Sequence, residues 1–485
     1  MSNSEVSGLR FYDTLSRRKK PFEPLEPGKV RMYLCGPTVY SDPHIGNFRS
    51  FLVGDIIRRW LEYRGYQVFY VMNITDIDDK TIRDSGKEGI SLKEFTERYT
   101  RSFLRGLDIL NIRRATVYPR ATENVPEMIE FIEKLIQKGL AYVSKDGVYY
   151  DISKFPGYGK LSGIDLSAVR TTERMLRDEY DKERPSDFAL WKRSTDEEIR
   201  RGIYFESPWG RGRPGWHIEC SVMSRKYLGD TLDIHAGGED LIFPHHENEI
   251  AQSEGLTGKE FARFWIHIGF LMVGGRKMSK SLGNYISFDE VISKYSPDAL
   301  RYFYISTHYR KQIDYTDEAM KSAENAIQRL GNTLENIEDT FHSSFENLDY
   351  TDREEKFLKE VVYQKMLFEE SMDDDLDTPR ALMSLHSISK IINEYILTKP
   401  NKGVLYKAYS IYRSLLDVLG LIESRKMKVD ILNESLIDLI IQIRDRLRNQ
   451  KMYEISDSIR EELKKIGILL IDRPEGTVWR FEEKV

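Results

Sequence analysis

The chain has 485 residues, of which 40% are hydrophobic and 31% charged, and its formal net charge is −5. At about 150 residues per domain this predicts roughly three domains of an ordinary soluble protein, and it excludes a membrane-spanning protein because no apolar run approaches roughly 18 residues. The opening stretch, "MSNSEVSGLRFYDTLSRRKK", lacks the apolar core of a signal peptide, so we expect a cytoplasmic protein, and any nucleic-acid partner must be bound by local basic surface.

The first part of the chain alternates strand and helix patterns. Apolar, β-rich runs at 29–35 and 67–73 enclose residues 47–65, in which apolar side chains recur at helical spacing before Gly65. Strand, helix and strand in this order predict a parallel βαβ unit. The pattern returns after residue 220 in "TLDIHAGG", "HHENEIAQSEG" and "FWIHIGFLMV". We therefore predict one doubly wound, Rossmann-like parallel sheet that is split by an insertion.

The remaining segments differ in composition. Residues 143–208 are rich in Gly, Pro, Tyr and charge, and form the predicted insertion. From residue 318 onward apolar residues follow helical stripes, which predicts an α-helical bundle. The final segment, 426–485, combines an amphipathic helix with the short extended pieces "GILLID" and "GTVWRF", which predicts a small C-terminal α/β domain. The predicted divisions are 1–142, 143–208, 209–275, 276–317, 318–425 and 426–485.

A candidate phosphate site lies where the first strand passes into the first helix. His44 and Asn47 stand there three positions apart in "PHIGNFRS". The free amides and the dipole of a helix start favour an anion such as phosphate. Taken alone, His44 is more simply interpreted as a helix cap. No Walker A sequence occurs in the chain.

The two cysteines, Cys35 and Cys220, are the next candidates. Two cysteines in so large a cytoplasmic chain argue against a structural disulfide, and leave metal binding, catalysis or inert burial. His245 and Glu249 are four positions apart and share one helix face, so the four residues offer S, S, N and O donors suited to zinc. A plain polar helix face is the alternative. His217 and His246 compete as the imidazole ligand, and spacing does not separate them.

A Gly-flanked loop, "GGRKMSKSLGN", carries Lys277 and Lys280. By itself it is most simply a solvated basic loop.

The chain as a whole resembles the class I aminoacyl-tRNA synthetases, and among them the cysteinyl-tRNA synthetase family, from about residue 9 to the C-terminus. The motifs that carry this resemblance are "HIGN", "KMSKS", "MYLCGPTVY", "NITDIDDK", "RPGWHIECS", "FPHHENEIAQS" and "DALRYF". The resemblance implies an ATP-dependent ligation of L-cysteine to tRNA(Cys) through a cysteinyl-adenylate, with Mg²⁺ accompanying ATP, in a monomer, as is usual in the family.

The resemblance also implies roles for individual residues. It implies one zinc ion that recognises the substrate thiol, bound by Cys35, Cys220, His245 and Glu249, and thereby favours His245 over the other imidazoles. It implies that catalysis depends on His44, Asn47, Lys277 and Lys280. ATP would be bound by His44, Asn47, Gly237, Gly238, Asp240 and Lys280, and cysteine by Gly36, Thr75, Trp216 and Asp240.

The chain departs from the family signature at one position. The signature often reads H-I-G-H, whereas Asn47 stands last here. An asparagine can donate a hydrogen bond to phosphate but carries no charge, so we expect His44 to contribute more to catalysis. The resemblance assigns 1–142 and 209–275 to the catalytic domain and 276–317 to the lysine loop and stem-contact region. An insertion confined to 143–208 is too short for a separate editing domain.

The resemblance implies that residues 426–485 bind the anticodon. This segment contains 12 Lys or Arg and 12 Asp or Glu, so its net charge cannot attract RNA. Contact is expected from a basic stretch of the long helix, because unpaired bases are the usual targets of sequence-specific RNA readers. The predicted tRNA-contacting residues are Arg444, Arg446, Arg448, Lys451 and Trp479. For Trp479, packing into the domain core is the favoured alternative.

Two rival functions differ in what they require. A relative that joins cysteine to an amino sugar in mycothiol synthesis lacks the C-terminal tRNA-binding region, which this chain keeps. A catalytically dead regulatory paralogue is expected to have lost the lysine loop or a zinc ligand, and both are intact in this sequence.

Overall fold

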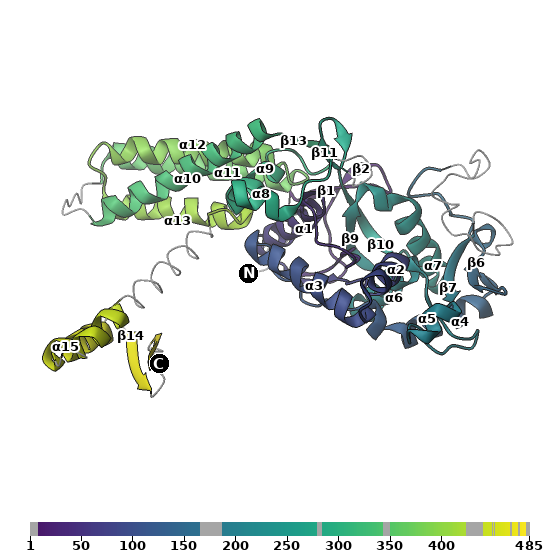
Figure 1. Cartoon of the computed structure of the whole chain (residues 1–485). Coiled ribbons are helices and arrows are strands. Elements are labelled where there is room, and N and C mark those ends of the chain that lie inside the picture. Colours follow the sequence, from purple (N-terminus) through teal and green to yellow (C-terminus); the bar gives the residue numbers. More distant parts are fainter. Residues whose placement is uncertain are drawn as a thin grey trace. The chain divides into compact units, whose positions relative to one another are not determined.

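The structure, a computed structural model, describes residues 8–164, 187–278, 284–342, 350–422, 440–448, 450, 452–465, 468–473 and 476–481. The chain divides into two units, Met1–Ile422 and Glu423–Val485. Figure 1 shows their elements. Among the described residues, none of the helices combines the length and the apolar character that crossing a membrane requires.

A parallel four-stranded sheet forms the centre of the first unit. Its strands lie in the order β10-β9-β3-β4, and their bounds are β3 (Lys29–Leu34), β4 (Gln67–Met72), β9 (Leu232–Gly238) and β10 (Ala262–Ile268). β3 pairs directly with β9, so a strand from before the insertion lies beside one from after it. The prediction of one Rossmann-like sheet split by an insertion is confirmed.

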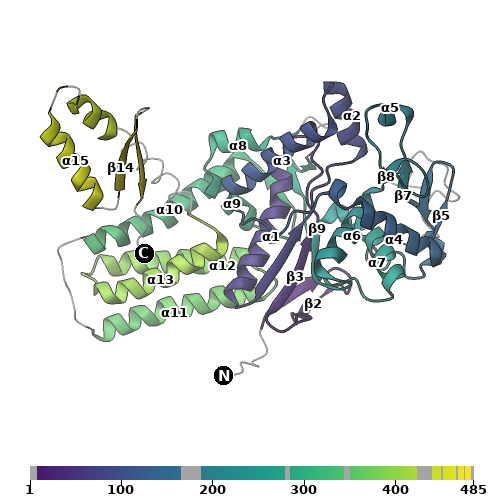
Figure 2. The same ribbon diagram turned by 90° about the horizontal axis from the view of Figure 1, so that it is seen from below.

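Helices cover both faces of this sheet. Figure 2 shows α1 and α3 on one side of the strands and α6 and α7 on the other. These helices are α1 (Ile45–Tyr63), α3 (Leu92–Ile109), α6 (Trp216–Leu228) and α7 (Glu247–Thr257). The apolar spacing of α1 buries Phe48, Leu52 and Trp60. A strand buried between two helix layers explains the continuous apolar runs of the sequence.

The insertion carries an antiparallel sheet of its own, in the order β5-β6-β7-β8. Its strands are β5 (Ala141–Val143), β6 (Gly147–Tyr150), β7 (Phe188–Arg193) and β8 (Gly212–Pro214), so the sheet extends beyond residues 143–208 at both ends. The chain enters α6 through Gly215, whose amide donates to the Leu190 carbonyl. A Cβ at Gly215 would lie 2.0 Å from the Ala189 oxygen, so only glycine fits this passage.

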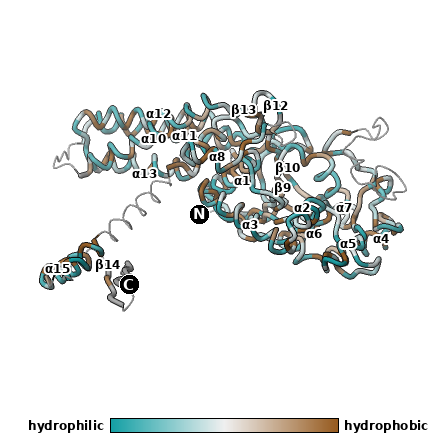
Figure 3. The backbone as a smooth tube through the Cα atoms, viewed as in Figure 1, coloured by the Kyte–Doolittle hydropathy of each residue, from teal (hydrophilic) through white to brown (hydrophobic). Residues whose placement is uncertain are grey.

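An α-helical bundle follows the second half of the sheet. Its helices are α8 (Phe288–Lys294), α9 (Pro297–Ile305), α10 (Asp317–His342), α11 (Asp352–Asp373), α12 (Thr378–Ile396) and α13 (Lys402–Leu419). Hydrophobic and hydrophilic residues alternate along these helices (Figure 3), as expected where one side is buried. The predicted stripe of α10 is buried at Met320, Leu330 and Ile337. The predicted bundle is confirmed.

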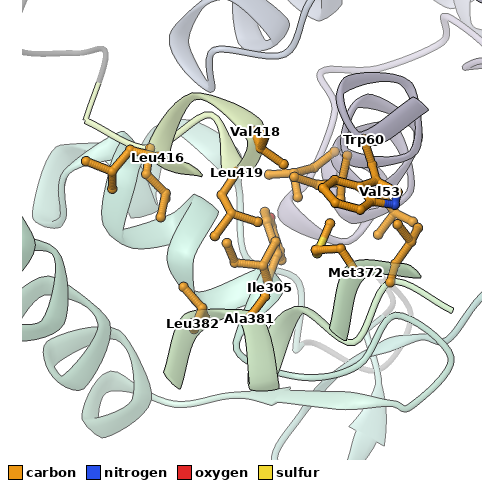
Figure 4. Close-up of a cluster of buried hydrophobic side chains, with 14 of the residues drawn as sticks. Val53, Trp60, Ile305, Met372, Ala381, Leu382, Leu416, Val418 and Leu419 are labelled. Carbon is orange, nitrogen blue, oxygen red and sulfur yellow. The ribbon is translucent and has the colours of Figure 1, made fainter. Parts of the chain in front are cut away.

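Bundle and sheet domain share one apolar core. Figure 4 shows Val53 and Trp60 of α1 facing side chains from α9, α11, α12 and α13. Among them, Ile305, Met372 and Leu419 are at most 2% exposed. The bundle is therefore fixed against the helix that begins at the candidate phosphate site.

A buried ion cluster lies within this joint. Asp55 of α1 accepts hydrogen bonds from Arg59 (2.8 Å) and Arg301 of α9 (2.5 Å), and all three side chains are at most 3% exposed. Burial opposes ionisation of Asp55, but Arg301 and Arg59 outweigh it and lower the pKa of the carboxyl. The cluster is thus a charged group inside the core.

The end of the first unit is fastened to the same region. The carbonyl oxygen of Leu419 accepts from Arg301 (2.6 Å), and that of Gly420 from the side chain of Asn111 (2.9 Å). The amide of Ile422 donates to Asp298 (3.0 Å). The last described residues of this unit therefore have a fixed position.

Short elements complete the first unit. They are β1 (Arg10–Asp13), β2 (Arg18–Pro21), α2 (Asp79–Glu88), α4 (Val125–Gln137), α5 (Asp196–Arg200), β11 (Leu271–Val273), β12 (Arg276–Lys277) and β13 (Ile313–Tyr315). In the second unit a helical stretch at 440–448 precedes α15 (Tyr453–Lys465) and the antiparallel pair β14 (Ile468–Arg473) and β15 (Gly476–Phe481). The predicted small C-terminal α/β domain is confirmed.

Candidate active site

The carboxyl ends of the parallel strands gather most of the predicted site residues. β3 ends before Cys35 and Gly36, β4 ends before Asn73, and β9 ends at Gly237 and Gly238. In open parallel sheets this edge is where ligands bind. A Cβ at Gly36 would lie 1.8 Å from the Asn73 carbonyl oxygen, so the close approach of the two segments requires glycine.

Behind this edge lies the predicted set of metal ligands. One ligand atom from each of Cys35, Cys220, His245 and Glu249 lies within 4.8 Å of the others, and all four residues are buried. The two sulfurs are 3.8 Å apart, and His245 Nε2 is 3.0 Å from Glu249 Oε1. The four residues come from the end of β3, from α6, from the turn before α7 and from α7. Folding therefore brings together the donors that the sequence predicted.

A second donor set overlaps the first. Cys35 and Glu249 also lie within 4.8 Å of His235 and His246. The Nε2 atom of His246 is 3.4 Å from Cys35 Sγ, while its Nδ1 lies 2.8 Å from His267 Nε2. The sequence prediction had not included His235, which lies on β9 and whose Nε2 is 2.8 Å from Glu249 Oε2.

The competing His217 occupies a different place. Its Nδ1 atom lies 2.9 Å from the Nδ1 of His245, beside that imidazole. Both donor sets found among the described residues are made without His217, so it supports His245 from outside. Partners of this kind orient a metal-binding imidazole.

The charges of the cluster suit a cation. Burial opposes the ionisation of Cys220, yet hydrogen bonds from Cys35 and His245 lower its pKa to about 6. Burial likewise opposes the ionisation of Glu249, but His235 and His245 lower its pKa to about 2. Burial and the neighbouring Cys220 raise the pKa of Cys35 well above its usual value. Two thiols, an imidazole and a carboxylate buried together are donors that fit zinc.

A chain of hydrogen bonds links two of the predicted substrate residues, Gly36 and Thr75, to each other and to α6. Thr75 donates to Glu219 (2.7 Å) and accepts from the Asn73 side chain (3.1 Å), and Asn73 Oδ1 accepts from the amide of Gly36 (2.8 Å). Asn73 and Glu219 were not predicted as site residues, although both stand within quoted motifs, "NITDIDDK" and "RPGWHIECS". Burial raises the pKa of Glu219 well above its usual value.

The remaining predicted substrate residues, Trp216 and Asp240, are exposed to solvent. Trp216 is 39% exposed, and its ring centroid lies 4.3 Å from that of His245. Asp240 is exposed in the turn after β9. The exposed Trp216 ring therefore covers an imidazole of the buried cluster.

His44 and Asn47 form the start of α1. Asn47 donates its amide to His44 Nδ1 (3.2 Å), and Asn47 Oδ1 accepts from the amide of His44 (3.1 Å). His44 therefore caps the helix, and the cap uses Nδ1 of its ring. Because Nδ1 accepts a hydrogen bond, the proton of the neutral ring is assigned to Nε2, which is therefore a donor.

The lysine loop is described only at its two ends. Lys277 lies in β12, and Lys280 lies outside the described residues. At the first end Met278 is 6% exposed, and its sulfur accepts from the amide of Ile286 at the second end (3.4 Å). His44 pairs with Ser287 in an isolated β-bridge. The loop therefore begins and ends beside the start of α1.

The residues predicted to contact tRNA differ in how exposed they are. Arg444 is fully buried, whereas Arg446 is exposed and Arg448 half-buried. A buried guanidinium does not face RNA, so the prediction for Arg444 is corrected. Lys451 lies outside the described residues, and of Trp479 only the backbone, in β15, is described.

Two protein-family models match this chain. The model described as "tRNA synthetases class I (C) catalytic domain" matches residues 21–325, and the "DALR domain" matches residues 367–423. The first covers the sheet and its insertion, and the second falls on the helical bundle.

Curated relatives match almost the whole chain. Proteins named "Cysteine--tRNA ligase" are 46% identical in Thermococcus onnurineus and 49% identical in Methanosarcina acetivorans, over 97% and 96% of this chain and 99% and 98% of the relatives. One in Bacillus cereus is 45% identical over 97% of this chain and 99% of that protein.

A solved structure with the same fold is more distant. Methionyl-tRNA synthetase of Mycobacterium tuberculosis, in complex with methionyl-adenylate, has a TM-score of 0.63 and 16% identity, covering 83% of this chain and 94% of that one. At this identity the likeness concerns the fold alone.

Proposed function

The chain belongs to the cysteine-tRNA ligases of class I, enzymes that charge tRNA with cysteine, and we propose that it does so through a cysteinyl-adenylate, with the substrate thiol recognised by zinc. The observation that carries this proposal is the buried cluster of Cys35, Cys220, His245 and Glu249 at the carboxyl edge of the sheet. The same membership supports tRNA(Cys), L-cysteine and ATP as substrates. We extend the proposal to a monomer that acts in the cytoplasm, which light scattering and cell fractionation would test.

The thiol is the chemical basis of selection. Shape alone discriminates poorly, since a methylene-sized difference is worth only about 10- to 200-fold. Zinc held by these four residues would supply a soft Lewis acid that prefers a thiolate to the hydroxyl of serine. Gly36, Thr75, Trp216 and Asp240 would bind the rest of the amino acid.

Adenylation needs positioning and charge neutralisation. The cysteine carboxylate attacks the α-phosphate of ATP and pyrophosphate leaves, which is chemistry that proteins accelerate by alignment and electrostatics. His44 Nε2–H would donate to the triphosphate, with Asn47 beside it, while Lys277 and Lys280 supply charge and Mg²⁺ accompanies ATP. Gly237, Gly238 and Asp240 would bind the adenosine end. The 2′-hydroxyl of the terminal tRNA adenosine would then attack the acyl carbon of the adenylate and release AMP, so no protein nucleophile is needed.

One experiment tests the proposal as a whole. Cysteine-dependent ATP–pyrophosphate exchange should be present, and the protein should charge a tRNA with a GCA anticodon. A protein that activates cysteine but transfers it to an amino sugar, and leaves tRNA uncharged, would establish the mycothiol-type function. A dead paralogue would show neither reaction.

Lys280→Ala should slow cysteine-dependent exchange by roughly a hundredfold, while ATP affinity changes much less. The reason is that the lysine charge meets a partner charge that develops as pyrophosphate leaves, and losing one such donor costs about 10²–10³ in kcat. Exchange kinetics at varied ATP measure both quantities. Lys321→Ala, which removes an exposed lysine of α10, is the control and should be unaffected. An unchanged rate for Lys280→Ala would show that the loop is only a solvated turn without a role in adenylation.

Truncation after Ile422 should leave exchange largely intact and nearly abolish charging of tRNA. All residues proposed for adenylation precede this position, and the chain end there is held by Asp298 and Arg301. Exchange and charging assays on the same preparation make the comparison. In the full chain, the double variant Arg446→Ala and Arg448→Ala should lower charging and spare exchange. Equal charging by truncated and full chains would contradict anticodon recognition by the second unit.

A further inference from the structure

Tyr285 lies against His44, although no motif of the sequence includes it. The two ring centroids are 5.6 Å apart and the ring planes meet at 88°, so one ring meets the other edge to face. The tyrosine hydroxyl is 3.4 Å from the carbonyl oxygen of Asp42, a long contact. The residue is half-buried. Tyr285 and His44 therefore contact each other ring against ring.

The segment that carries Tyr285 connects the lysine loop to the start of α1. The amide of Ile286 donates to the sulfur of Met278, and Ser287 forms a β-bridge with His44. A Cβ at Gly46 would lie 3.0 Å from His44 Nδ1 and 3.2 Å from Met278 Cε, so these groups are tightly packed. The segment that follows the loop therefore contacts His44 through both Tyr285 and Ser287.

The imidazole is held on its other side by the helix start. Asn47 donates to Nδ1 and thereby fixes the tautomer and one direction of the ring. The edge-to-face ring of Tyr285 adds a packing contact that further restricts rotation of the imidazole about its Cβ–Cγ bond. Tyr285 thus complements the cap, so that the Nε2–H donor has one direction.

We propose that Tyr285 is a positioning residue: its ring holds the His44 imidazole in one orientation, so that the Nε2–H donor is directed at the triphosphate of ATP. This inference rests on the proposed function and deepens it. The hydroxyl of Tyr285 takes no part. A misplacement of about 1 Å in a positioned group can cost up to roughly a hundredfold in rate, so a measurable effect is expected.

A double-mutant cycle with His44 tests the inference. Tyr285→Ala should lower the exchange rate at saturating ATP and cysteine roughly tenfold, with KM for cysteine unchanged, and Tyr285→Phe should stay within about twofold. In the His44→Ala background, Tyr285→Ala should add less than about twofold, because its effect passes through His44. Tyr295→Ala, which removes another partly buried tyrosine of this region that contacts Asp317, is the control.

Three kinetic results would overturn the inference: an unchanged rate in Tyr285→Ala, an equal loss in Tyr285→Phe, or effects that multiply in the double variant. Histidine NMR provides a readout without activity. The His44 ring signals, identified by their loss in His44→Ala, should keep their shifts in Tyr285→Phe and lose the ring-current contribution in Tyr285→Ala. Unmoved signals would also overturn it. Absence of exchange in the parent protein would instead refute the proposed function, and the NMR comparison would still decide the contact.

Discussion

Cys220→Ser is expected to remove bound zinc and to slow cysteine-dependent pyrophosphate exchange by more than roughly a hundredfold, since altering even an outer partner of a metal site costs about 10–100-fold. Cys220 is 2% exposed and its sulfur lies 3.8 Å from that of Cys35. A serine hydroxyl stays protonated at neutral pH, so the site would lose one of its two soft anionic donors. Metal analysis of the purified variant and exchange kinetics measure the two effects.

The control for this variant is Ser224→Ala, on the same helix and equally buried, whose hydroxyl donates to the Ser221 carbonyl oxygen. It should keep its zinc. Full zinc occupancy in Cys220→Ser, with unchanged affinity for cysteine, would refute the assignment.

The two overlapping donor sets can be separated in the same way. Replacing His245 with Gln removes an imidazole from one set, and replacing His246 with Gln removes one from the other. If the proposed ligands are right, zinc should be lost from His245→Gln and largely kept in His246→Gln. Zinc kept in His245→Gln and lost from His246→Gln would show that the metal is bound by the set that contains His235.

Asp55→Ala is expected to lower the free energy of unfolding of the first unit by about 3–5 kcal/mol, the usual cost of removing one partner of a buried ion pair. The variant leaves the guanidinium groups of Arg59 and Arg301 in the core without their carboxylate. Folded and unfolded arginine are both charged, so the penalty is the uncompensated burial of that charge. Urea unfolding followed by tryptophan fluorescence gives the midpoint, and Trp60 in the adjoining core is a suitable probe.

Lys390→Ala provides the comparison, because Lys390 and Glu394 form an exposed pair on α12. Such pairs contribute little, so its unfolding midpoint should stay where it is. An Asp55→Ala protein that unfolded at the same urea concentration as the parent would show that the buried cluster is not a source of stability.

The sheet and its helices could be predicted because their signals are local. Apolar runs of strand length and the helical spacing of Phe48, Leu52 and Trp60 follow from which faces are buried. The motif cysteines, far apart in the sequence, could be joined only by assuming that both halves build one sheet, and the pairing of β3 with β9 confirmed that assumption.

The details of the site could not be predicted from spacing. On α7 and the turn before it, positions three and four before Glu249 both face that carboxylate, so His245 and His246 are equivalent until tertiary contacts are known. His235 was missed because a histidine on a buried strand has no pattern of its own. Tyr285 was missed because its partner lies far away in the sequence.

Arg444 was predicted as a site residue, but that prediction was wrong. A cluster of arginines on one helix predicted a contact surface, but Arg444 lies on the face of that stretch buried with Ile441, in a unit whose small core also holds Leu463 and Leu470. Which arginine faces inward depends on α15 and β14, which follow later in the chain, and charge pattern alone does not reveal it.

The fastened end of the first unit has a consequence for how such proteins can change over time. Arg301, Asn111 and Asp298 hold the chain up to Ile422 through hydrogen bonds that lie entirely within the first unit. A lineage can therefore lose, duplicate or exchange the segment beyond it without refolding the part that precedes it. If that segment reads the anticodon as proposed, RNA preference and amino-acid chemistry are separable traits, and a chimera that carries a foreign C-terminal segment after Ile422 should inherit the parent's stability.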